Sequence, residues 1–237
     1  MIYDAHLHVE SGMDSYQLEI DGGNVIYNYV SSYQELRHLY PSFEASLIFD
    51  IKDNLEFVLQ EGKAQHISAY KIHNRLQGWR EEDLPELIEK LALASDDIPI
   101  IYDAFPFGPE LDCQPSLAGL IKLATTFPKR KFVAAHAGGY DILKYFFHLK
   151  PLENVYMELS FSLQYLYDSS LAADLKKVCR FFPSERIFFG TDYPFAHARF
   201  QLEILEGILT ELNKEKEEIE GILFHNARDF YRKKDHE

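Results

Sequence analysis

The fold is best predicted from residues 98–137, which read IPIIYDAFPFGPELDCQPSLAGLIKLATTFPKRKFVAAHA. Short apolar runs at 98–104 and 132–137 have the composition of buried strands, and residues 115–127 between them have a helical pattern. A strand, a helix and a second strand in this order form a βαβ unit with two parallel strands. The stretch therefore predicts an α/β fold.

The same alternation of strand and helix continues along the whole chain. The other predicted strands are 2–9, 24–30, 45–50, 66–73, 154–160 and 186–192. The other predicted helices lie near 32–40, 53–62, 83–95, 139–149, 170–182, 198–213 and 216–231. Such a series in 237 residues matches a (β/α)₈ TIM barrel, which commonly forms one domain of about 250 residues. We predict one barrel domain over residues 1–237. The alternative is an open doubly wound sheet, although the first strand lacks a glycine-rich phosphate turn.

The composition favours a cytoplasmic protein that acts on a small molecule. A net charge of −14 argues against nucleic acid as a partner, because little counterion release is to be gained. Cys113 and Cys179 form no disulfide framework, so we expect a reducing compartment. The start MIYDAHLHVE does not resemble a signal peptide, and no run reaches the roughly 18 apolar residues of a membrane span. Assembly into a homo-oligomer is a further possibility.

Polar side chains of types that bind metals stand at the ends of several predicted strands. They are His6, His8, Lys71, His73, Asp103, His136 and Asp192. The carboxyl ends of barrel strands build the active site, and a buried His, Lys or Asp there is costly unless it is paired or bound to metal. The sequence therefore predicts one site at the barrel mouth.

His6 and His8 begin the predicted metal site. Alternate residues of a strand point to the same face, so the two imidazoles can share a Zn²⁺, Mn²⁺ or Fe²⁺ ion. A His-x-His pair also occurs on exposed strands where it binds no metal. Asp4 has the same parity, and it either accepts an imidazole N–H or binds backbone amides at the start of the strand.

For each polar residue at the later strand ends, we consider one functional role and one structural role. Asp192 either binds metal and takes a proton from water, or caps the next helix. His136, which precedes the tight turn predicted at Gly138 and Gly139, is either catalytic or a core histidine. Asp103 is either a further ligand or orienting base, or a turn residue.

Two further strands carry polar residues of less certain direction. Lys71 and His73 share parity and face the mouth together or not at all; a salt bridge of Lys71 is the commoner outcome, and a carboxylated lysine the rarer one. Glu158 has the parity of Tyr156, and we expect it to face the helices.

These motifs, in this order and spacing, resemble the amidohydrolase superfamily and specifically its amidohydrolase-2 branch, which includes aminocarboxymuconate-semialdehyde decarboxylase and several lactone hydrolases. The matching motifs are DAHLHV at 4–9, KIHN at 71–74, AHAGG at 135–139, NVYMELS at 154–160, FFGTDYPF at 188–195 and HNARDFY at 225–231. The resemblance implies a distorted TIM barrel with one or two metal ions. It implies His6, His8 and Asp192 as ligands, Asp192 also as general base, and His136 as the group that polarises the substrate or holds the attacking water.

One position departs from the pattern of that branch. Its members commonly have a histidine ligand at the end of the fifth strand, where this chain has Asp103. Either Asp103 replaces that ligand or the ligand is lost, so we expect one divalent ion, zinc first, and no second ion. TatD-type nucleases share the first pair and the final aspartate, but they usually have a glutamate where this chain reads YKIH, and the net charge does not suit DNA.

We predict a metal-dependent hydrolase that cleaves a small ester, lactone or amide through a metal-activated water. Lys71, His73, Asp4 and Tyr193 are predicted to contact the substrate or to support the ligands. The alternative activity is non-oxidative decarboxylation of an unsaturated or aromatic acid on the same site. A barrel without activity is the third possibility, which the departure at Asp103 keeps open.

Overall fold

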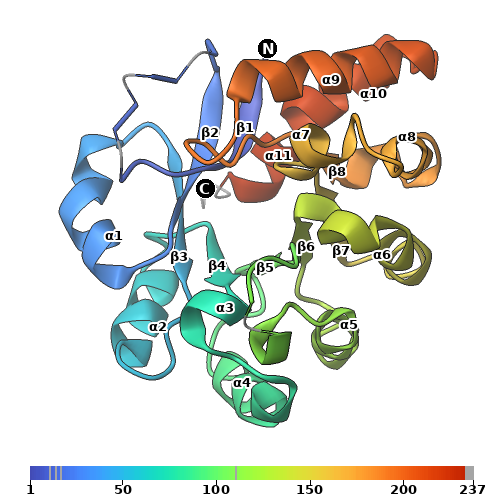
Figure 1. Ribbon diagram of the computed structural model, residues 1–237. Helices are drawn as coiled ribbons and strands as arrows, with labels where there is room; N and C mark the ends of the chain where they lie inside the picture. Colours follow the sequence, from blue (N-terminus) through green and yellow to red (C-terminus); the bar gives the residue numbers. More distant parts are fainter. Residues whose placement is uncertain (11, 14, 17, 110, 233–237) are drawn as a thin grey trace.

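Eight parallel strands follow one another around a barrel in their order along the chain, in a computed structural model that describes residues 1–10, 12–13, 15–16, 18–109 and 111–232 (Figure 1). They are β1 (Tyr3–Leu7), β2 (Gly22–Tyr27), β3 (Glu44–Ile48), β4 (Ala69–Ile72), β5 (Ile100–Asp103), β6 (Phe132–Ala135), β7 (Val155–Glu158) and β8 (Ile187–Phe188). Each strand overlaps the range predicted for it. The predicted parallel sheet is confirmed.

The sheet returns to its first strand just after β8. The Ala5 N–H donates to the carbonyl oxygen of Phe189 at 3.0 Å, and the His8 N–H donates to that of Tyr193 at 2.8 Å. An open doubly wound sheet has no such bonds between its first and last strands. The (β/α)₈ TIM barrel is therefore confirmed.

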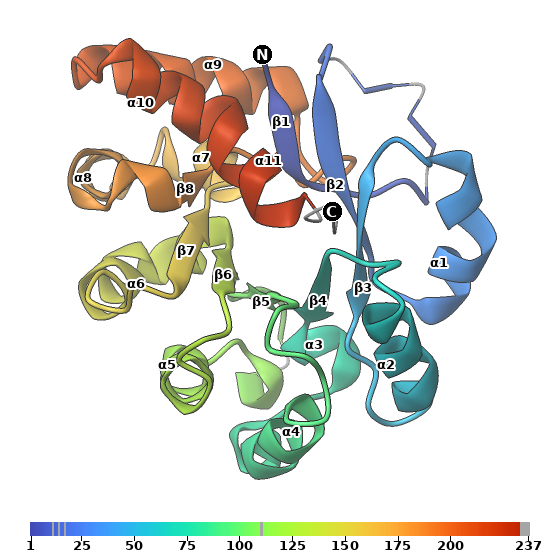
Figure 2. The same cartoon turned by 180° about the vertical axis from the view of Figure 1, so that it is seen from behind.

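Helices surround the strands on the outside (Figures 1 and 2). They are α1 (Val30–Leu36), α2 (Leu55–Lys63), α4 (Leu84–Leu91), α5 (Leu117–Thr126), α6 (Ile142–Leu149), α8 (Ala172–Phe181), α9 (Ala198–Glu211) and α10 (Lys216–Glu220). The last helix, α11 (Asn226–Tyr231), lies across one end of the barrel (Figure 2). A π-helical turn, Gly221–His225, joins α10 to α11. Two short helices after β4 and β7, α3 (Asn74–Gln77) and α7 (Ser162–Leu166), lie outside the predicted ranges. Among the described residues, no helix combines the length and apolarity needed to cross a membrane.

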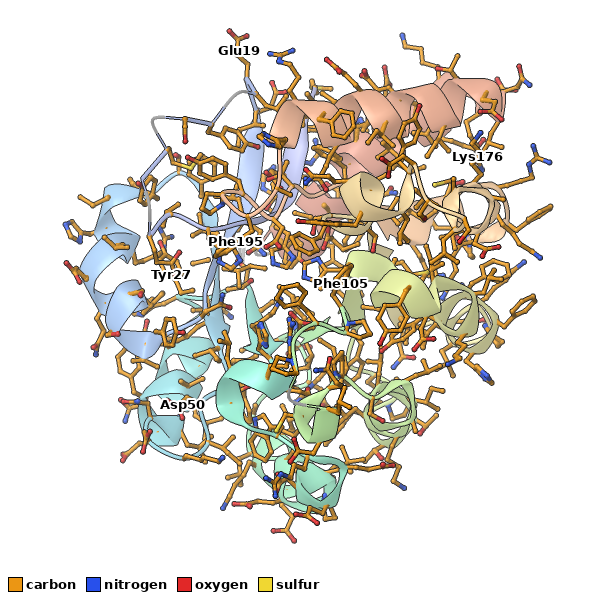
Figure 3. The ribbon with its side chains drawn as sticks, viewed as in Figure 1. Glu19, Tyr27, Asp50, Phe105, Lys176 and Phe195 are labelled. Carbon is orange, nitrogen blue, oxygen red and sulfur yellow. The ribbon has the colours of Figure 1, made fainter. Side chains whose placement is uncertain are left out.

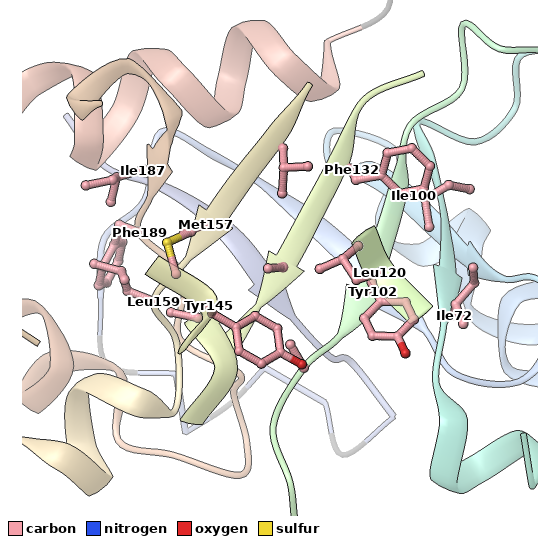
Figure 4. Packing of buried hydrophobic residues seen from close by; sticks show 14 of the residues in the cluster. Ile72, Ile100, Tyr102, Leu120, Phe132, Tyr145, Met157, Leu159, Ile187 and Phe189 are labelled. Atoms are coloured by element: carbon pink, nitrogen blue, oxygen red, sulfur yellow. The ribbon is translucent and has the colours of Figure 1, made fainter. Parts of the chain in front are cut away.

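The strands separate two hydrophobic clusters. The larger one lies between the strands and the surrounding helices and includes Ile100, Tyr102 and Met157 (Figure 4). The smaller one includes the alternate residues Ile101 and Phe188 inside the barrel, because successive side chains of a strand point to opposite faces.

The last helix closes the amino-terminal end of the barrel. Figure 2 shows α11 across that opening. Its Tyr231 belongs to the inner cluster, and the ring centroids of Tyr231 and Phe188 lie 6.1 Å apart. Because this end is filled with apolar side chains, polar groups gather at the opposite, carboxyl end of the strands.

Candidate metal centre

Three side chains that are distant in the sequence converge on one point at the carboxyl end of the barrel. His6 Nε2 lies 3.4 Å and His8 Nε2 lies 3.2 Å from Asp192 Oδ1. All three residues are buried. Two ligand atoms that are each about 2.1 Å from one ion, with ordinary bond angles, lie roughly 3.0–3.4 Å apart. Both distances to Asp192 Oδ1 therefore match ligands of one divalent ion, and the ligand atoms of all three residues lie within 4.8 Å of one another.

Hydrogen bonds determine which ring nitrogen of each histidine faces Asp192. His8 Nδ1 lies 2.7 Å from the carbonyl oxygen of Ile26, and His6 Nδ1 lies 3.0 Å from Glu158 Oε2. These oxygens accept, so each Nδ1 carries the hydrogen and each Nε2 of a neutral ring keeps its lone pair. Two lone pairs that face one carboxylate oxygen repel it unless a cation lies between them. The donor set thus fits a divalent metal ion.

His136 faces the same space from the end of β6. Its Nε2 lies 3.7 Å from Asp103 Oδ2, and its ring centroid lies 4.7 Å from that of His6. On the other side of the ring, Nδ1 lies 3.0 Å from Ser160 Oγ and 3.2 Å from the Ser160 carbonyl oxygen. Nδ1 therefore carries the hydrogen, and Nε2 faces the site.

The backbone is unusual at the two residues predicted to be catalytic. His136 and Asp192 have φ angles of 61° and 54°, in the left-handed region. This conformation costs about 1–3 kcal/mol in residues other than glycine and concentrates at functional sites. Gly138 and Gly139 also have positive φ, and a Cβ at Gly138 would lie 2.5 Å from a ring carbon of Tyr145. The predicted tight turn is confirmed.

Glu158 belongs to the site, although its parity with Tyr156 predicted that it would face the helices. That prediction is wrong, because the carboxylate is 1% exposed and contacts His6 inside the barrel. Glu158 and Tyr156 do share a face, but it is the inner one, and Tyr156 stacks on Phe188 there. The intervening Met157 packs in the outer cluster. The signal available in the sequence is the apolar Met157 between Tyr156 and Glu158, because an apolar residue is the one expected to pack against the helices.

Asp103 lies beside Lys71, His73 and Arg75 instead of beside the three converging donor atoms. Asp103 Oδ2 lies 3.3 Å from His73 Nε2 and 3.8 Å from Lys71 Nζ, and Oδ1 lies 3.6 Å from an Arg75 nitrogen. His73 Nδ1 accepts from the Leu76 N–H at 3.4 Å, so Nε2 carries the hydrogen and donates to Asp103. Lys71 and His73 thus both face the mouth, Lys71 in a salt bridge.

Burial and the neighbouring charges shift the titration of these groups. Burial, followed by the charge of Lys71, holds the pKa of His6 well below its usual value. Burial also lowers the pKa of His73 to about 4, against the opposing charge of Asp103. Burial favours the protonated form of Asp103, but the interactions with His73 and Lys71 outweigh it and hold the pKa well below its usual value. Near neutral pH, the His6 ring is uncharged and can offer the lone pair of Nε2 to a metal ion, and Asp103 is an anion.

Asp4 does not contact an imidazole. Its Oδ1 accepts from the backbone N–H groups of Thr191 and His6 at 2.9 and 3.1 Å, and its Oδ2 accepts from the Thr191 and Tyr16 hydroxyls, both at 2.6 Å. An irregular register between Asp4 and Leu7 breaks the parity that the sequence analysis assumes. Of the two predicted roles, Asp4 has the one that binds backbone amides, and it ties β1 to the segment that carries Asp192.

A cavity of about 460 Å³ adjoins the convergent donor atoms. Its apolar wall includes Phe105, Phe161 and Phe195, and its charged residues include Lys71 and Arg75. Phe105 and Phe195 lie near the centre of the barrel mouth in Figure 3.

Two further aromatic residues near the carboxyl end do not line this cavity. Tyr193 is buried, and its hydroxyl lies 2.6 Å from Ser15 Oγ. Trp79 lines a neighbouring cavity of about 440 Å³.

The sequence matches a known family over most of its length. The family model described as Amidohydrolase matches residues 55–233. The match begins after His6 and His8, so the first strand of the site lies outside it. A search of curated protein sequences finds no match.

Several solved structures have the same fold. One is an uncharacterized TIM-barrel protein from Bordetella bronchiseptica, with a TM-score of 0.66 and 19% identity over 88% of this chain and 76% of that one. Another is a probable 2-pyrone-4,6-dicarboxylic acid hydrolase from Acinetobacter baumannii, with a TM-score of 0.61 and 13% identity over 97% and 98% of the two chains. A third is 5-carboxyvanillate decarboxylase from Sphingomonas paucimobilis, with a TM-score of 0.58 and 11% identity over 90% and 79%. At these identities the likeness supports the fold.

Proposed function

We propose a function on the premise that this chain belongs to the amidohydrolase family, whose model matches residues 55–233. The chain is an enzyme of that family. The specific proposal is that it hydrolyses a small ester, lactone or amide at the carboxyl end of the barrel. The observation that carries it is the convergence of His6 Nε2 and His8 Nε2 on Asp192 Oδ1, at 3.4 and 3.2 Å.

His6, His8 and Asp192 would hold one divalent ion, for which we propose zinc. When bound, such an ion supplies a Lewis acid and lowers the pKa of water from about 15.7 toward roughly 7. Asp103 is also predicted as a ligand, but its contacts support a role as counter-ion of Lys71 and Arg75 and as acceptor of the His73 N–H.

Two residues of the chain would move or hold protons. The carboxylate of Asp192 takes the proton of the attacking water as general base and returns it to the leaving group. Burial lowers the pKa of His136, but its interactions with Asp103 and Asp192 outweigh this and raise the pKa. His136 can therefore be protonated at Nε2 and donate to the carbonyl oxygen as negative charge develops there.

The test is turnover of a panel of 4-nitrophenyl esters, lactones and amides by the full chain loaded with zinc. We expect hydrolysis of at least one of them, with kcat reduced about 10²–10⁴-fold in Asp192→Asn, since this is the usual contribution of a general base. Glu203→Gln, on the outer helix α9, is the control and should retain full activity. No turnover of any substrate by the zinc-loaded chain would favour a barrel without activity.

Decarboxylation is the second candidate, and Arg75 is the observation that favours it. The Arg75 side chain lines the cavity and is 19% exposed, so its guanidinium can bind a carboxylate. The likeness to a carboxyvanillate decarboxylase is consistent with this. Release of carbon dioxide from a panel of aromatic acids, without hydrolysis of the esters, would replace the hydrolase proposal with a carboxy-lyase.

Three expectations stay predictions: a cytoplasmic location, the absence of nucleic-acid and membrane partners, and a homo-oligomer. Size-exclusion chromatography with light scattering tests the last of these.

A further inference from the structure

We propose that Glu158 is a positioning residue that sets the ring tautomer of His6 and, through Ser160, holds the ring of His136. The tautomer proposal stands on hydrogen bonds alone. Its consequence for a metal ion rests on the proposed function.

The carboxylate of Glu158 is surrounded by donors. Oε2 lies 3.0 Å from His6 Nδ1, 2.8 Å from Ser160 Oγ and 3.4 Å from the His136 backbone nitrogen. Oε1 accepts from the Ser160 backbone N–H. Among the described residues, the ion-pair partners of Glu158 are imidazoles and include no lysine or arginine. A buried carboxylate is costly without a cation, so packing alone does not explain an acid at this position.

The bond to His6 has a chemical consequence. A carboxylate oxygen only accepts, so His6 must carry its hydrogen on Nδ1, and Nε2 is left with a lone pair toward Asp192. An acceptor behind the ring of a ligating histidine is the usual device that orients the ring and fixes its tautomer. His8 achieves the same through the Ile26 carbonyl oxygen, 2.7 Å from its Nδ1.

The same carboxylate reaches His136 through one intermediate residue. Glu158 binds both the N–H and the hydroxyl of Ser160, and the hydroxyl and carbonyl oxygens of Ser160 lie 3.0 and 3.2 Å from His136 Nδ1. Glu158 thus links the ring predicted to hold metal to the ring predicted to act on the substrate.

A glutamine at this position cannot replace all these contacts. Its amide offers one accepting oxygen and one donating nitrogen, whereas both carboxylate oxygens of Glu158 accept here. In Glu158→Gln, the –NH₂ group faces either the Ser160 N–H or His6 Nδ1. The second arrangement forces the His6 hydrogen onto Nε2, where it blocks the lone pair.

The test measures the tautomer by ¹⁵N NMR of histidine-labelled, metal-free full-length protein, with His6 assigned by comparison with His6→Gln. We expect His6 in the Nδ1–H form in the wild type and a shift toward the Nε2–H form in Glu158→Gln. We also expect Co²⁺ to bind about 10–100-fold more weakly to Glu158→Gln, as measured by visible absorption.

Two control variants separate this role from general damage. Glu61→Gln removes another glutamate that faces an imidazole: Glu61 belongs to α2, and its Oε2 lies 3.1 Å from His66 Nδ1. This change should alter neither measurement. Ser160→Ala leaves the bond from Glu158 to His6 in place and should keep both the His6 tautomer and the Co²⁺ affinity.

An Nε2–H form of His6 in the wild type would overturn the proposal, and this measurement does not depend on whether the variant folds. Unchanged tautomer and affinity in Glu158→Gln would overturn it as well. If the wild type shows the Nδ1–H form but binds no Co²⁺, the positioning role stands and the proposed metal function fails.

Discussion

The role of Asp103 can be tested at the scale of the single residue. Its carboxylate faces the buried Lys71 and the half-buried His73 and Arg75, at 3.3–3.8 Å. Removing one partner of a buried charge cluster costs about 3–5 kcal/mol, because the remaining charges are left uncompensated. We therefore expect Asp103→Asn to lower the free energy of unfolding by about this amount, as measured by urea denaturation, while one bound metal ion is retained.

The matched control for this change is Asp112→Asn. Asp112 is 60% exposed and forms a surface pair with Arg80 at 3.0 Å, so its loss should change stability by less than about 1 kcal/mol. Loss of metal from Asp103→Asn with little change in stability would instead make Asp103 a ligand.

Gly190 provides a second test at this scale. A Cβ at Gly190 would overlap the Glu158 carboxylate and lie 3.0 Å from His6 Cβ. Overpacking of this kind typically costs about 1–3 kcal/mol, so Gly190→Ala should be destabilised by that amount and should bind Co²⁺ more weakly. In Gly207→Ala the added Cβ meets nothing within 4 Å on α9. That variant should be as stable as the wild type or more stable, and equal effects of the two changes would contradict this account.

Residue types and their spacing predicted much of the site, but not the direction of every side chain. The convergence of His6, His8 and Asp192 follows from their places at strand ends. Glu158 was assigned to the wrong face because its parity with Tyr156 does not by itself say which face is inside; the apolar Met157 between them, which packs in the outer cluster, is the residue that does. The two roles predicted for Asp4 could not be separated, because an irregular register interrupts β1 and one strand read in isolation does not reveal such an irregularity.

At the scale of elements, α5 shows how a local signal defines a helix. Ser116 precedes the helix in an extended conformation, and its Oγ accepts from the Gly119 N–H at 3.1 Å. Loss of such a cap costs about 1 kcal/mol, so Ser116→Ala should lower the free energy of unfolding by that amount in urea denaturation.

Thr125→Ala is the control within the same helix. Its hydroxyl donates to the Ile121 carbonyl oxygen at 2.8 Å on the exposed side, and alanine has the higher helix propensity. Stability should therefore be unchanged or slightly higher. A loss equal to that of Ser116→Ala would contradict the assigned cap.

The long helices were predicted closely because hydrophobic periodicity extends over several turns. The short helix α3 was missed because its four residues offer no period, and its cap is the side chain of His73. The last strand was predicted to reach Asp192 but ends at Phe188. Phe189 still bonds to β1, and the left-handed backbone at Asp192 then turns the chain away from the strand direction.

At the scale of the whole molecule, the barrel has an apolar amino-terminal end and a polar carboxyl end that carries the candidate site. Helix α11 and the inner cluster around Phe188 and Tyr231 fill the amino-terminal end. The site gathers at the other end, from segments as distant in sequence as β1 and the residues after β8. Only closure of the sheet brings His6 and Asp192 together, so the fold is the precondition of the proposed metal site.

The most direct test of the proposed metal site is anomalous scattering from crystals of the full chain grown with Zn²⁺, recorded on both sides of the zinc absorption edge. We expect one anomalous peak about 2.1 Å from His6 Nε2, His8 Nε2 and an Asp192 oxygen. Asp103 should lie outside the coordination sphere. No peak at the barrel mouth, or a peak that leaves His6 and His8 uncoordinated, would contradict the proposed site.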